Sequence, residues 1–419
     1  MSFRFIHTAD VHLDSPLKSL ALRDPDIAEL IGNATRRSFE KTVDLCLDEV
    51  VDALMIAGDL YDGDLRSMKT AVFLGRQMRR LTESGIRVFV IRGNHDAESV
   101  ITKHLTLPEG VHVFSGRGET VPIEGQDVAV HGVSFGKPHM PKSLLPKYKP
   151  RVEGCTNIGL LHTSLAGSTE HDVYSPCSLS DLTGHGYDYW GLGHIHKREV
   201  HATSPCVVVM PGIPQGRHIN EAGPKSVTYV EIGSDGVVIE ERFTSVAQFE
   251  RVAVDIGGVE DWRGVLQAIE AAIGAARDLL HADYLVARLE VHGTTALASR
   301  LRRDRDVLIE EARQSAEAIG KTFVESISID VDALNSQGVP SDYDPITELR
   351  TLIGAGARST DAVRASAFEL LSDLQGQLPP ALRDSFGQSD EDLRQTVEQF
   401  LKVGGEEVLA RLEAEQTDA

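Results

Sequence analysis

Short apolar runs alternate with amphipathic stretches along the first 245 residues of the chain. Five of these runs have the length and composition of buried strands, namely Phe3–Ile6, Ala53–Ala57, Val88–Ile91, Ile158–Leu161 and Tyr189–Leu192. Two stretches with apolar residues at helical spacing, Thr35–Val51 and Leu65–Glu83, lie between the first three runs. This alternation predicts an open α/β sheet, in which the carboxyl ends of the strands line one crevice.

The pattern changes after Phe249. Three further runs have the pattern of strands, and two helical stretches separate them. The strands are expected at Val252–Ile256, Leu285–His292 and Thr322–Asp330, and the helices at about Trp262–Leu279 and Thr295–Ala318. This β-α-β-α-β order predicts a small α/β cap domain.

The last part of the chain has a linker followed by a helical tail. The composition of Asn335–Asp344 is typical of a linker. Beyond it, apolar residues recur at helical spacing, from Ile346 to Ile353 and from Val363 to Leu374, and Gly404-Gly405 is expected to separate a last helix. We therefore predict three domains, at residues 1–245, 246–334 and 345–419.

A polar motif lies at or just after the end of each of the five strands in the first part. The motifs are H-T-A-D-V-H, A-G-D-L-Y-D, R-G-N-H-D, L-L-H-T and L-G-H-I-H, and the side chains in them that could bind cations are Asp10, His12, Asp59, Asn94, His162, His194 and His196. Two carboxylates, one amide oxygen and four imidazoles suit two hard or borderline divalent cations. Each motif alone is more often a turn or a packing feature. Together, in this order and each after a predicted strand, they indicate a metal site.

The order of the ligands predicts how they divide between two ions. One ion would be held by Asp10, His12, Asp59 and His196, and the other by Asp59, Asn94, His162 and His194. Asp59 would bridge the ions, because a carboxylate has two oxygens. Two ions about 3.5–4 Å apart activate water and stabilise the charge that develops at phosphorus. His95 would lie outside the metal shell and donate to the phosphate or the leaving oxygen, with Asp96 or Asp62 orienting it.

The motifs D-x-H, G-D, G-N-H-D, H and G-H-x-H, in this order, resemble those of the calcineurin-like metallophosphoesterase family. H-T-A-D-V-H-L-D-S-P and G-D-L-Y-D are similar to the SbcD-like DNA repair exonucleases, and Pro211–Glu221 is similar to the P-G-x-x-Q-G-R-H-x-x-E segment of the YhaO branch. Over about residues 1–245, the resemblance implies a four-layer α/β/β/α sandwich, manganese as the usual metal and nuclease activity on DNA. One position departs, because some relatives carry G-D-x-x-H where this chain has Asp62. A histidine's role cannot be assigned to that position.

Two segments could contact a substrate. Arg217 and His218 follow the strand-turn Val207–Gly212 and would overhang the metal face to bind a phosphate, unless they form an ordinary surface turn. A basic segment without acidic residues contains Lys137, Lys142, Lys147, Lys149 and Arg151. Its four prolines predict a loop. The loop would either be plainly solvated or follow phosphates, with Tyr148 stacking on a base.

Composition constrains the partners and the compartment. The formal charge of −21 argues against a generic nucleic-acid binder. Part of this charge is localised, because residues 338–419 contain 16 acidic and 7 basic residues. Four cysteines without a C-x-x-C pair fit a reducing cytoplasm. No run approaches the ~20 apolar residues of a membrane span, and a strand at the N-terminus leaves no room for a signal peptide. We expect a cytoplasmic protein.

The SbcD-like resemblance implies DNA as substrate and an SbcC-like coiled-coil ATPase as the partner that docks on the tail, and it allows a homodimer. Two alternatives remain open. One is a phosphatase or phosphodiesterase that acts on a small molecule, which would not require the cap and the acidic tail beyond residue 250. The other is a non-catalytic scaffold subunit with a vestigial metal site. The complete set of seven ligands argues against a vestigial site.

Overall fold

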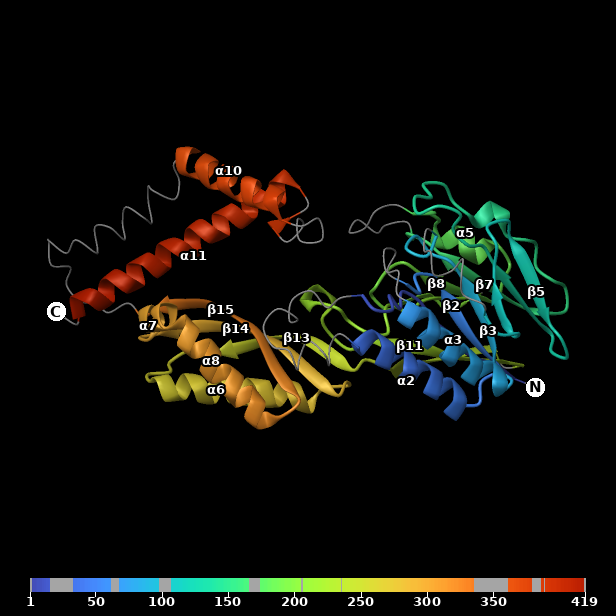
Figure 1. The fold of residues 1–419 in the computed structure, drawn as a ribbon, viewed down its shortest axis with the longest axis horizontal. Coiled ribbons are helices and arrows are strands. Elements are labelled where there is room, and N and C mark those ends of the chain that lie inside the picture. The colour runs from blue at the N-terminus through green and yellow to red at the C-terminus, as the bar shows by residue number, and fades with distance from the viewer. Residues whose placement is uncertain are drawn as a thin grey trace. The chain divides into compact units, whose positions relative to one another are not determined.

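Two six-stranded sheets form the first part of the protein (Figure 1). The computed structural model describes residues 2–15, 33–61, 68–97, 107–165, 174–204, 206–234, 236–334, 361–378, 386–387 and 389–417. The first sheet has the order β12 (Gly236–Phe243), β11 (Ser226–Gly233), β1 (Phe3–Thr8), β2 (Ala53–Ala57), β3 (Arg87–Ile91) and β4 (Val111–Val113). The second has the order β5 (Glu119–Ile123), β6 (Val128–Gly132), β7 (Thr156–His162), β8 (Tyr189–Gly193), β10 (Val207–Met210) and β9 (Glu199–Ala202).

Parallel strands occupy the middle of both sheets. β1, β2, β3 and β4 pair in parallel in the first sheet, and β6, β7, β8 and β10 do so in the second. Such strands are buried on both faces, which explains their nearly continuous apolar sequence. All five residues of β2 are buried, for example, as are all five of β8.

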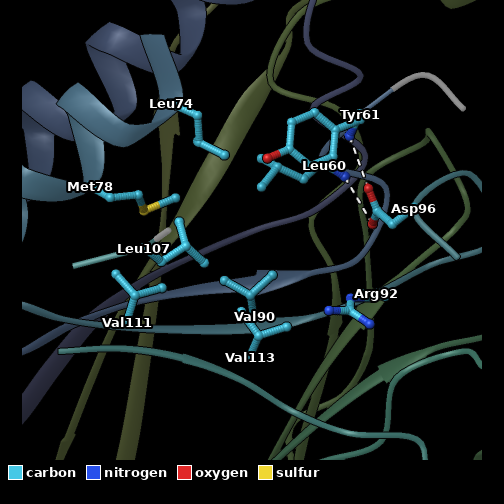
Figure 2. A pocket seen from close by; sticks show the side chains of 10 residues that line it. All are labelled: Leu60, Tyr61, Leu74, Met78, Val90, Arg92, Asp96, Leu107, Val111 and Val113. Atoms are coloured by element: carbon cyan, nitrogen blue, oxygen red, sulfur yellow. Dashed lines mark hydrogen bonds between the residues drawn. The ribbon is translucent and has the colours of Figure 1, made fainter. Parts of the chain in front are cut away.

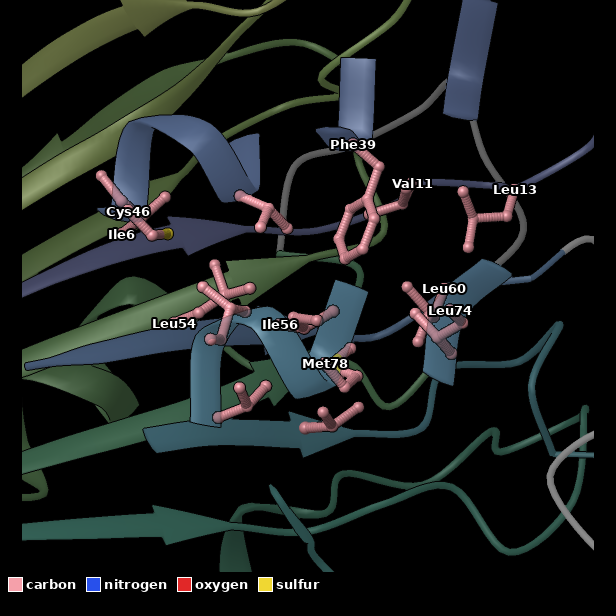
Figure 3. Close-up of a cluster of buried hydrophobic side chains, with 14 of the residues drawn as sticks. Ile6, Val11, Leu13, Phe39, Cys46, Leu54, Ile56, Leu60, Leu74 and Met78 are labelled. Atoms are coloured by element: carbon pink, nitrogen blue, oxygen red, sulfur yellow. The ribbon is translucent and has the colours of Figure 1, made fainter. Parts of the chain in front are cut away.

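The sheets face one another across an apolar core that includes Phe5, Met55, Phe89, Leu160 and Tyr189. Helices α2 (Ala34–Asp48) and α3 (Met68–Glu83) cover the outer face of the first sheet. Figure 3 shows this second core, in which apolar residues of the two helices point toward β1 and β2. The residues labelled there on helices and strands are Phe39, Cys46, Leu74, Met78, Ile6, Leu54 and Ile56. Each helix is amphipathic and buries a single face.

Loops and one short helix, α5 (Leu179–Gly184), cover the outer face of the second sheet. Trp190 is fully buried there, and its indole nitrogen donates to the carbonyl of Leu182 at 3.0 Å. The predicted four-layer α/β/β/α sandwich is confirmed, with a fourth layer that is mostly irregular. Two 3₁₀ turns also occur, η1 (Leu145–Lys147) and η2 (Ile219–Glu221).

A three-stranded sheet follows, with the order β13 (Ala247–Asp255), β14 (Tyr284–Thr295) and β15 (Thr322–Ala333). Its helices are α6 (Trp262–Asp278), α7 (Ala298–Arg303) and α8 (Arg305–Ile319). The single helix predicted at Thr295–Ala318 is wrong, because Asp304 leaves the helical conformation at φ −98 and ψ 28 and separates α7 from α8. Aspartate is a poor residue for a helix interior, and its carboxylate here accepts from Arg303 at 2.8 and 3.0 Å.

The tail contains helices α10 (Asp361–Gln377) and α11 (Asp390–Thr417), which contact each other through Leu371, Leu393 and Val397. α11 runs through Gly404-Gly405 without interruption, so the break predicted there is wrong. Glycine costs a helix about 1 kcal/mol relative to alanine, which weakens a long helix without ending it. The predicted apolar positions from Ile346 to Ile353 lie outside the described residues.

The chain divides into two compact units. One comprises residues 1–251, 276–288 and 321–325, and the other residues 252–275, 289–320 and 326–419. The domain boundaries predicted at residues 245, 334 and 345 stay predictions. None of the helices among the described residues is long and apolar enough to cross a membrane.

Candidate metal centre

The predicted ligands lie at the carboxyl ends of parallel strands in both sheets. Asp10 and His12 follow β1, Asp59 follows β2, and Asn94 follows β3. From the second sheet, His162 ends β7, and His194 and His196 follow β8. The two sheets therefore contribute loops to one site, which is the arrangement that the strand pattern predicts.

Strained backbone aims several of these side chains. Asp10, His12, Asp59 and His194 have positive φ angles of 50, 45, 50 and 101°. A residue other than glycine adopts this region at a cost of about 1–3 kcal/mol, and such residues cluster at functional sites. The loops also approach closely, since a Cβ on Gly193 would lie 2.1 Å from the carbonyl oxygen of Ala57. Glycine is therefore required directly before His194.

Ligand atoms of the predicted residues converge into three overlapping groups. The atoms of each group lie within 4.8 Å of one another, and the groups are Asp10 with His12 and His196, His12 with Asp59 and His95, and Asp10 with Asp59 and His162. His12 Nε2 lies 3.3 Å from His196 Nε2. His162 Nε2 lies 2.9 Å from Asn94 Oδ1 and 3.5 Å from Asp59 Oδ2. His162 also shares a ligand group with Asp10 and Asp59, so both carboxylates lie within 4.8 Å of its ligand nitrogen.

The chemistry of this donor set fits divalent cations. Within the described residues, Asp10 Oδ1 is buried and has no hydrogen-bond partner, as expected of an oxygen that binds an ion. Burial alone would lower the pKa of His162, but the charge and hydrogen bond of Asp59 outweigh it and raise the pKa to about 9. The site therefore stabilises positive charge between its carboxylates. Burial and the charge of Arg217 lower the pKa of His12, which keeps that imidazole neutral as a ligand must be.

Hydrogen bonds behind the ligands fix their orientation. His162 Nδ1 lies 2.9 Å from the carbonyl of Ala57, which can only accept, so the proton is on Nδ1 and Nε2 faces Asn94 and Asp59. The backbone N–H of His194 donates to Asp10 Oδ2 at 2.8 Å. Asp10 thereby joins a loop of the first sheet to a loop of the second. Partners of this kind hold metal ligands in their binding geometry.

His95 lies at the metal face. Its backbone N–H donates to Asp59 Oδ1 at 3.0 Å, and its ring centroid lies 5.0 Å from that of His12. The nitrogen that His95 offers within the group of His12 and Asp59 means that it could bind a metal as well as donate a proton. Its predicted place outside the metal shell stays a prediction.

Asp96 joins two loops of the site through backbone contacts (Figure 2). Its carboxylate accepts from the N–H groups of Leu60, Tyr61 and Gly93 at 3.2, 3.0 and 3.1 Å. This carboxylate therefore fixes the segment after Asp59 and the segment before Asn94, a role different from the predicted orienting of His95. Asp62, the other residue predicted to orient His95, lies outside the described residues.

Arg217 and His218 lie beside the metal ligands, directly before the η2 turn. Arg217 Nη2 is 3.3 Å from His196 Nδ1, and Nη1 donates to Ser15 Oγ at 3.4 Å. His218 is more exposed, at 39% of its side chain. Both contact Glu221, a buried carboxylate that accepts from His196 Nδ1 at 2.7 Å. Glu221 closes the P-G-x-x-Q-G-R-H-x-x-E segment, and no role was predicted for it. The signal that could have found it is an acid three residues after R-H.

Tyr148 does not stack on a base. Its side chain is 7% exposed, its hydroxyl donates to the carbonyl of Leu160, and its ring contacts Trp190 edge-on at 5.1 Å. An amphipathic ring near an apolar layer is buried when its hydroxyl finds an acceptor. The interpretation of the basic loop as a platform with Tyr148 is therefore wrong.

Comparison with known proteins gives matches over both parts of the chain. Residues 3–198 match the calcineurin-like phosphoesterase family, and residues 249–332 match the middle domain of metallophosphoesterase YhaO. The chain is 33% identical over 347 residues to the uncharacterized metallophosphoesterase YhaO of Bacillus subtilis (strain 168), a match that covers 81% of this chain and 84% of that protein.

A second relative is the DNA double-strand break repair protein Mre11 of Aeropyrum pernix, 30% identical over 281 residues. This match covers 61% of this chain and 64% of that protein. Among solved structures, a dimetal phosphatase from Danio rerio matches 58% of this chain and 96% of its own length, with 13% identity and a TM-score of 0.40.

Proposed function

This chain belongs to the calcineurin-like metallophosphoesterase family, and from that premise we propose that it hydrolyses phosphodiester bonds in DNA with two divalent ions. The proposal is carried by the convergence of Asp10, His12, Asp59, His162 and His196 in overlapping ligand groups, with Asn94 Oδ1 2.9 Å from His162 Nε2. Manganese is the metal that we expect, because the family resemblance implies it and a donor set of carboxylates and imidazoles is compatible with it.

The proposed division of the ligands follows the sequence. Asp10, His12, Asp59 and His196 would hold one ion, and Asp59, Asn94, His162 and His194 the other. Such a pair supplies a water that is nucleophilic at neutral pH and positive charge for the phosphoryl oxygens. His95, at the face of the site, would donate a proton to the phosphate or the leaving oxygen. Asp96 would keep the loops of Asp59 and Asn94 in register while His95 acts.

DNA is proposed as the substrate because of the relatives and the basic residues beside the ligands. Arg217 lies next to His196, where it could bind a phosphate adjoining the scissile bond. Two observations favour the alternative of a small-molecule phosphodiesterase. The overall charge is −21, and Tyr148 is buried rather than available to a base.

The helical tail is the proposed docking site for an SbcC-like coiled-coil ATPase. Leu370 and Leu374 lie one turn apart on α10, and 72% and 48% of their surfaces are exposed. An acidic pair of helices with exposed leucines suits a basic helical surface. A homodimer and a cytoplasmic location are proposed on the resemblance and composition alone.

Metal content and substrate choice test the proposal together. The wild-type chain should bind two manganese ions and cleave DNA, whereas Asp59→Asn should lose both ions and several orders of magnitude in rate. Asp44→Asn, which alters a half-exposed carboxylate on α2, is the matched control. Two ions in Asp59→Asn would contradict the bridge. Hydrolysis of bis(p-nitrophenyl) phosphate without any DNA cleavage would support the small-molecule alternative instead.

A further inference from the structure

Glu221 is a buried carboxylate placed directly behind the metal ligands. It ends the η2 turn, and 7% of its side chain is exposed. A glutamate is seldom buried this deeply unless its charge is paired. Its partners are a predicted metal ligand, His196, and a predicted phosphate-binding residue, Arg217.

The contact with His196 determines which ring nitrogen carries the proton. His196 Nδ1 lies 2.7 Å from Glu221 Oε1. An ionised carboxylate can only accept, so Nδ1 must carry the hydrogen of a neutral imidazole. The lone pair is then on Nε2, which lies 3.3 Å from His12 Nε2 and belongs to the ligand group of Asp10 and His12. Glu221 thus selects the tautomer that can bind a metal at this position.

Arg217 presents a competing hydrogen bond. Its Nη2 lies 3.3 Å from the same Nδ1 of His196 and 2.9 Å from Glu221 Oε1. A guanidinium can only donate, so Arg217 favours the tautomer with a lone pair on Nδ1 and the proton on Nε2. That tautomer cannot bind a metal through Nε2. Glu221 prevents it by accepting from Arg217, at both the backbone N–H (2.7 Å) and the side chain.

We propose that Glu221 is a positioning residue that keeps His196 in its metal-binding tautomer and, by accepting from Arg217, holds this guanidinium beside the metal site without letting it donate to His196. One carboxylate therefore orients both a predicted metal ligand, His196, and a predicted phosphate-binding residue, Arg217. This inference rests on the proposed two-metal hydrolysis, but the tautomer of His196 can be measured without metal or substrate.

Glu221→Gln tests the inference with little change in shape. A glutamine has one accepting oxygen where Glu221 uses two, Oε1 for His196 and Oε2 for the backbone N–H of Arg217. Its NH₂ group must therefore replace one of them, and the several donors of Arg217 leave it facing His196 Nδ1. The matched control is Glu119→Gln, because Glu119 also contacts a histidine, His112, at 3.0 Å. Glu119 begins β5, its side chain is 35% exposed, and it lies outside the ligand motifs.

The first measurement is ¹⁵N NMR of the histidines in the metal-free full-length protein at pH 8, with His196→Gln used to assign the resonance. We expect the proton on Nδ1 in the wild type and in Glu119→Gln, and on Nε2 in Glu221→Gln. In Glu221→Gln combined with Arg217→Ala, the competing donor is absent and the proton should return to Nδ1. An unchanged tautomer in Glu221→Gln, or no return in the double variant, overturns the proposal.

The second measurement is calorimetric binding of Mn²⁺. Loss of a partner behind a metal ligand weakens binding about 10–100-fold, and we expect this for one of the two ions in Glu221→Gln only. If Glu221→Gln does not fold, Arg217→Ala alone is measured, and it should keep the proton on Nδ1 of His196 and bind Mn²⁺ like the wild type. A proton on Nε2, or weaker Mn²⁺ binding, in Arg217→Ala overturns the proposal that Glu221 and Arg217 compete at His196. A wild-type protein that fails to bind two ions would refute the proposed function. The tautomer of His196, measured in the metal-free protein, would still test the role of Glu221.

Discussion

His7 is a neutral histidine at the interface of the two sheets, and it should make the protein sensitive to acid. It lies on β1 and is fully buried. Its Nε2 is 3.1 Å from the carbonyl of Leu192, so this nitrogen carries the proton, and Nδ1 accepts from the hydroxyl of Tyr189 at 2.9 Å. Both partners belong to β8, the strand that precedes His194 and His196. Protonation of His7 at Nδ1 would reverse the hydrogen bond with Tyr189 and place a buried charge directly beneath the metal loops.

The expected effect follows from the pKa difference. Burial is the main cause that lowers the pKa of His7 from 6.5 to about 3. Between these values the unfolded chain binds a proton that the native protein excludes. The free energy of unfolding should therefore fall as the pH falls below 6.5, by up to about 1.4 kcal/mol per pH unit. Over the whole interval the contribution of His7 is roughly 5 kcal/mol.

Urea unfolding of the metal-free protein at pH 7, 5.5 and 4.5 measures this effect. A Trp262→Phe background leaves Trp190, buried in the second sheet, as the fluorescent reporter. His7→Gln retains one donor and one acceptor but does not titrate, so its unfolding free energy should depend less steeply on pH. His112→Gln, at a histidine whose side chain is 38% exposed, is the control and should follow the wild type. Equal slopes in His7→Gln and the wild type would refute the reasoning.

Four further changes test other parts of the protein. His95→Ala should keep both metals and lose roughly 10²–10⁴-fold in rate, and metal loss would show that His95 is a ligand. Arg217→Ala should weaken DNA binding and reduce its salt dependence by about one counterion, whereas an unchanged slope would mean that it contacts no phosphate. Val50→Gly should raise the free energy of unfolding by about 1 kcal/mol, because Val50 follows the C-cap of α2 at a φ of 48°, and a loss of stability would contradict this. Deleting residues 345–419 should abolish binding of an SbcC-like ATPase and spare hydrolysis of a small phosphodiester, and insolubility would show that the tail belongs to the core.

Local patterns predicted the strands and the place of the ligands. β2 has the predicted bounds, Ala53–Ala57, because a buried parallel strand needs an apolar residue at every position. The ligands could be predicted because they follow such strands, and strand ends share one edge. These inferences depend only on residues close in sequence.

Other features depend on contacts between distant residues. Glu221 lies 25 residues from His196, and Asp96 lies 36 residues from Leu60. Neither partnership leaves a periodic trace in the sequence. Tyr148 could have been exposed or buried until the layer around Trp190 was known. The two helix boundaries at Asp304 and at Gly404-Gly405 were predicted wrongly for a different reason. Helix propensity is a weak guide to whether a single residue ends a helix.

The joining of both sheets at the metal centre has a consequence for folding kinetics. His12 and His196 face each other although 184 residues separate them in sequence. Contacts of such separation form late, since a long loop must close before they contribute. A divalent ion can be held by the complete ligand set only after the sheets have docked. Metal uptake therefore reports a finished sandwich, and a bound ion should stabilise the docked sheets against unfolding, because the complete site exists only in the folded chain.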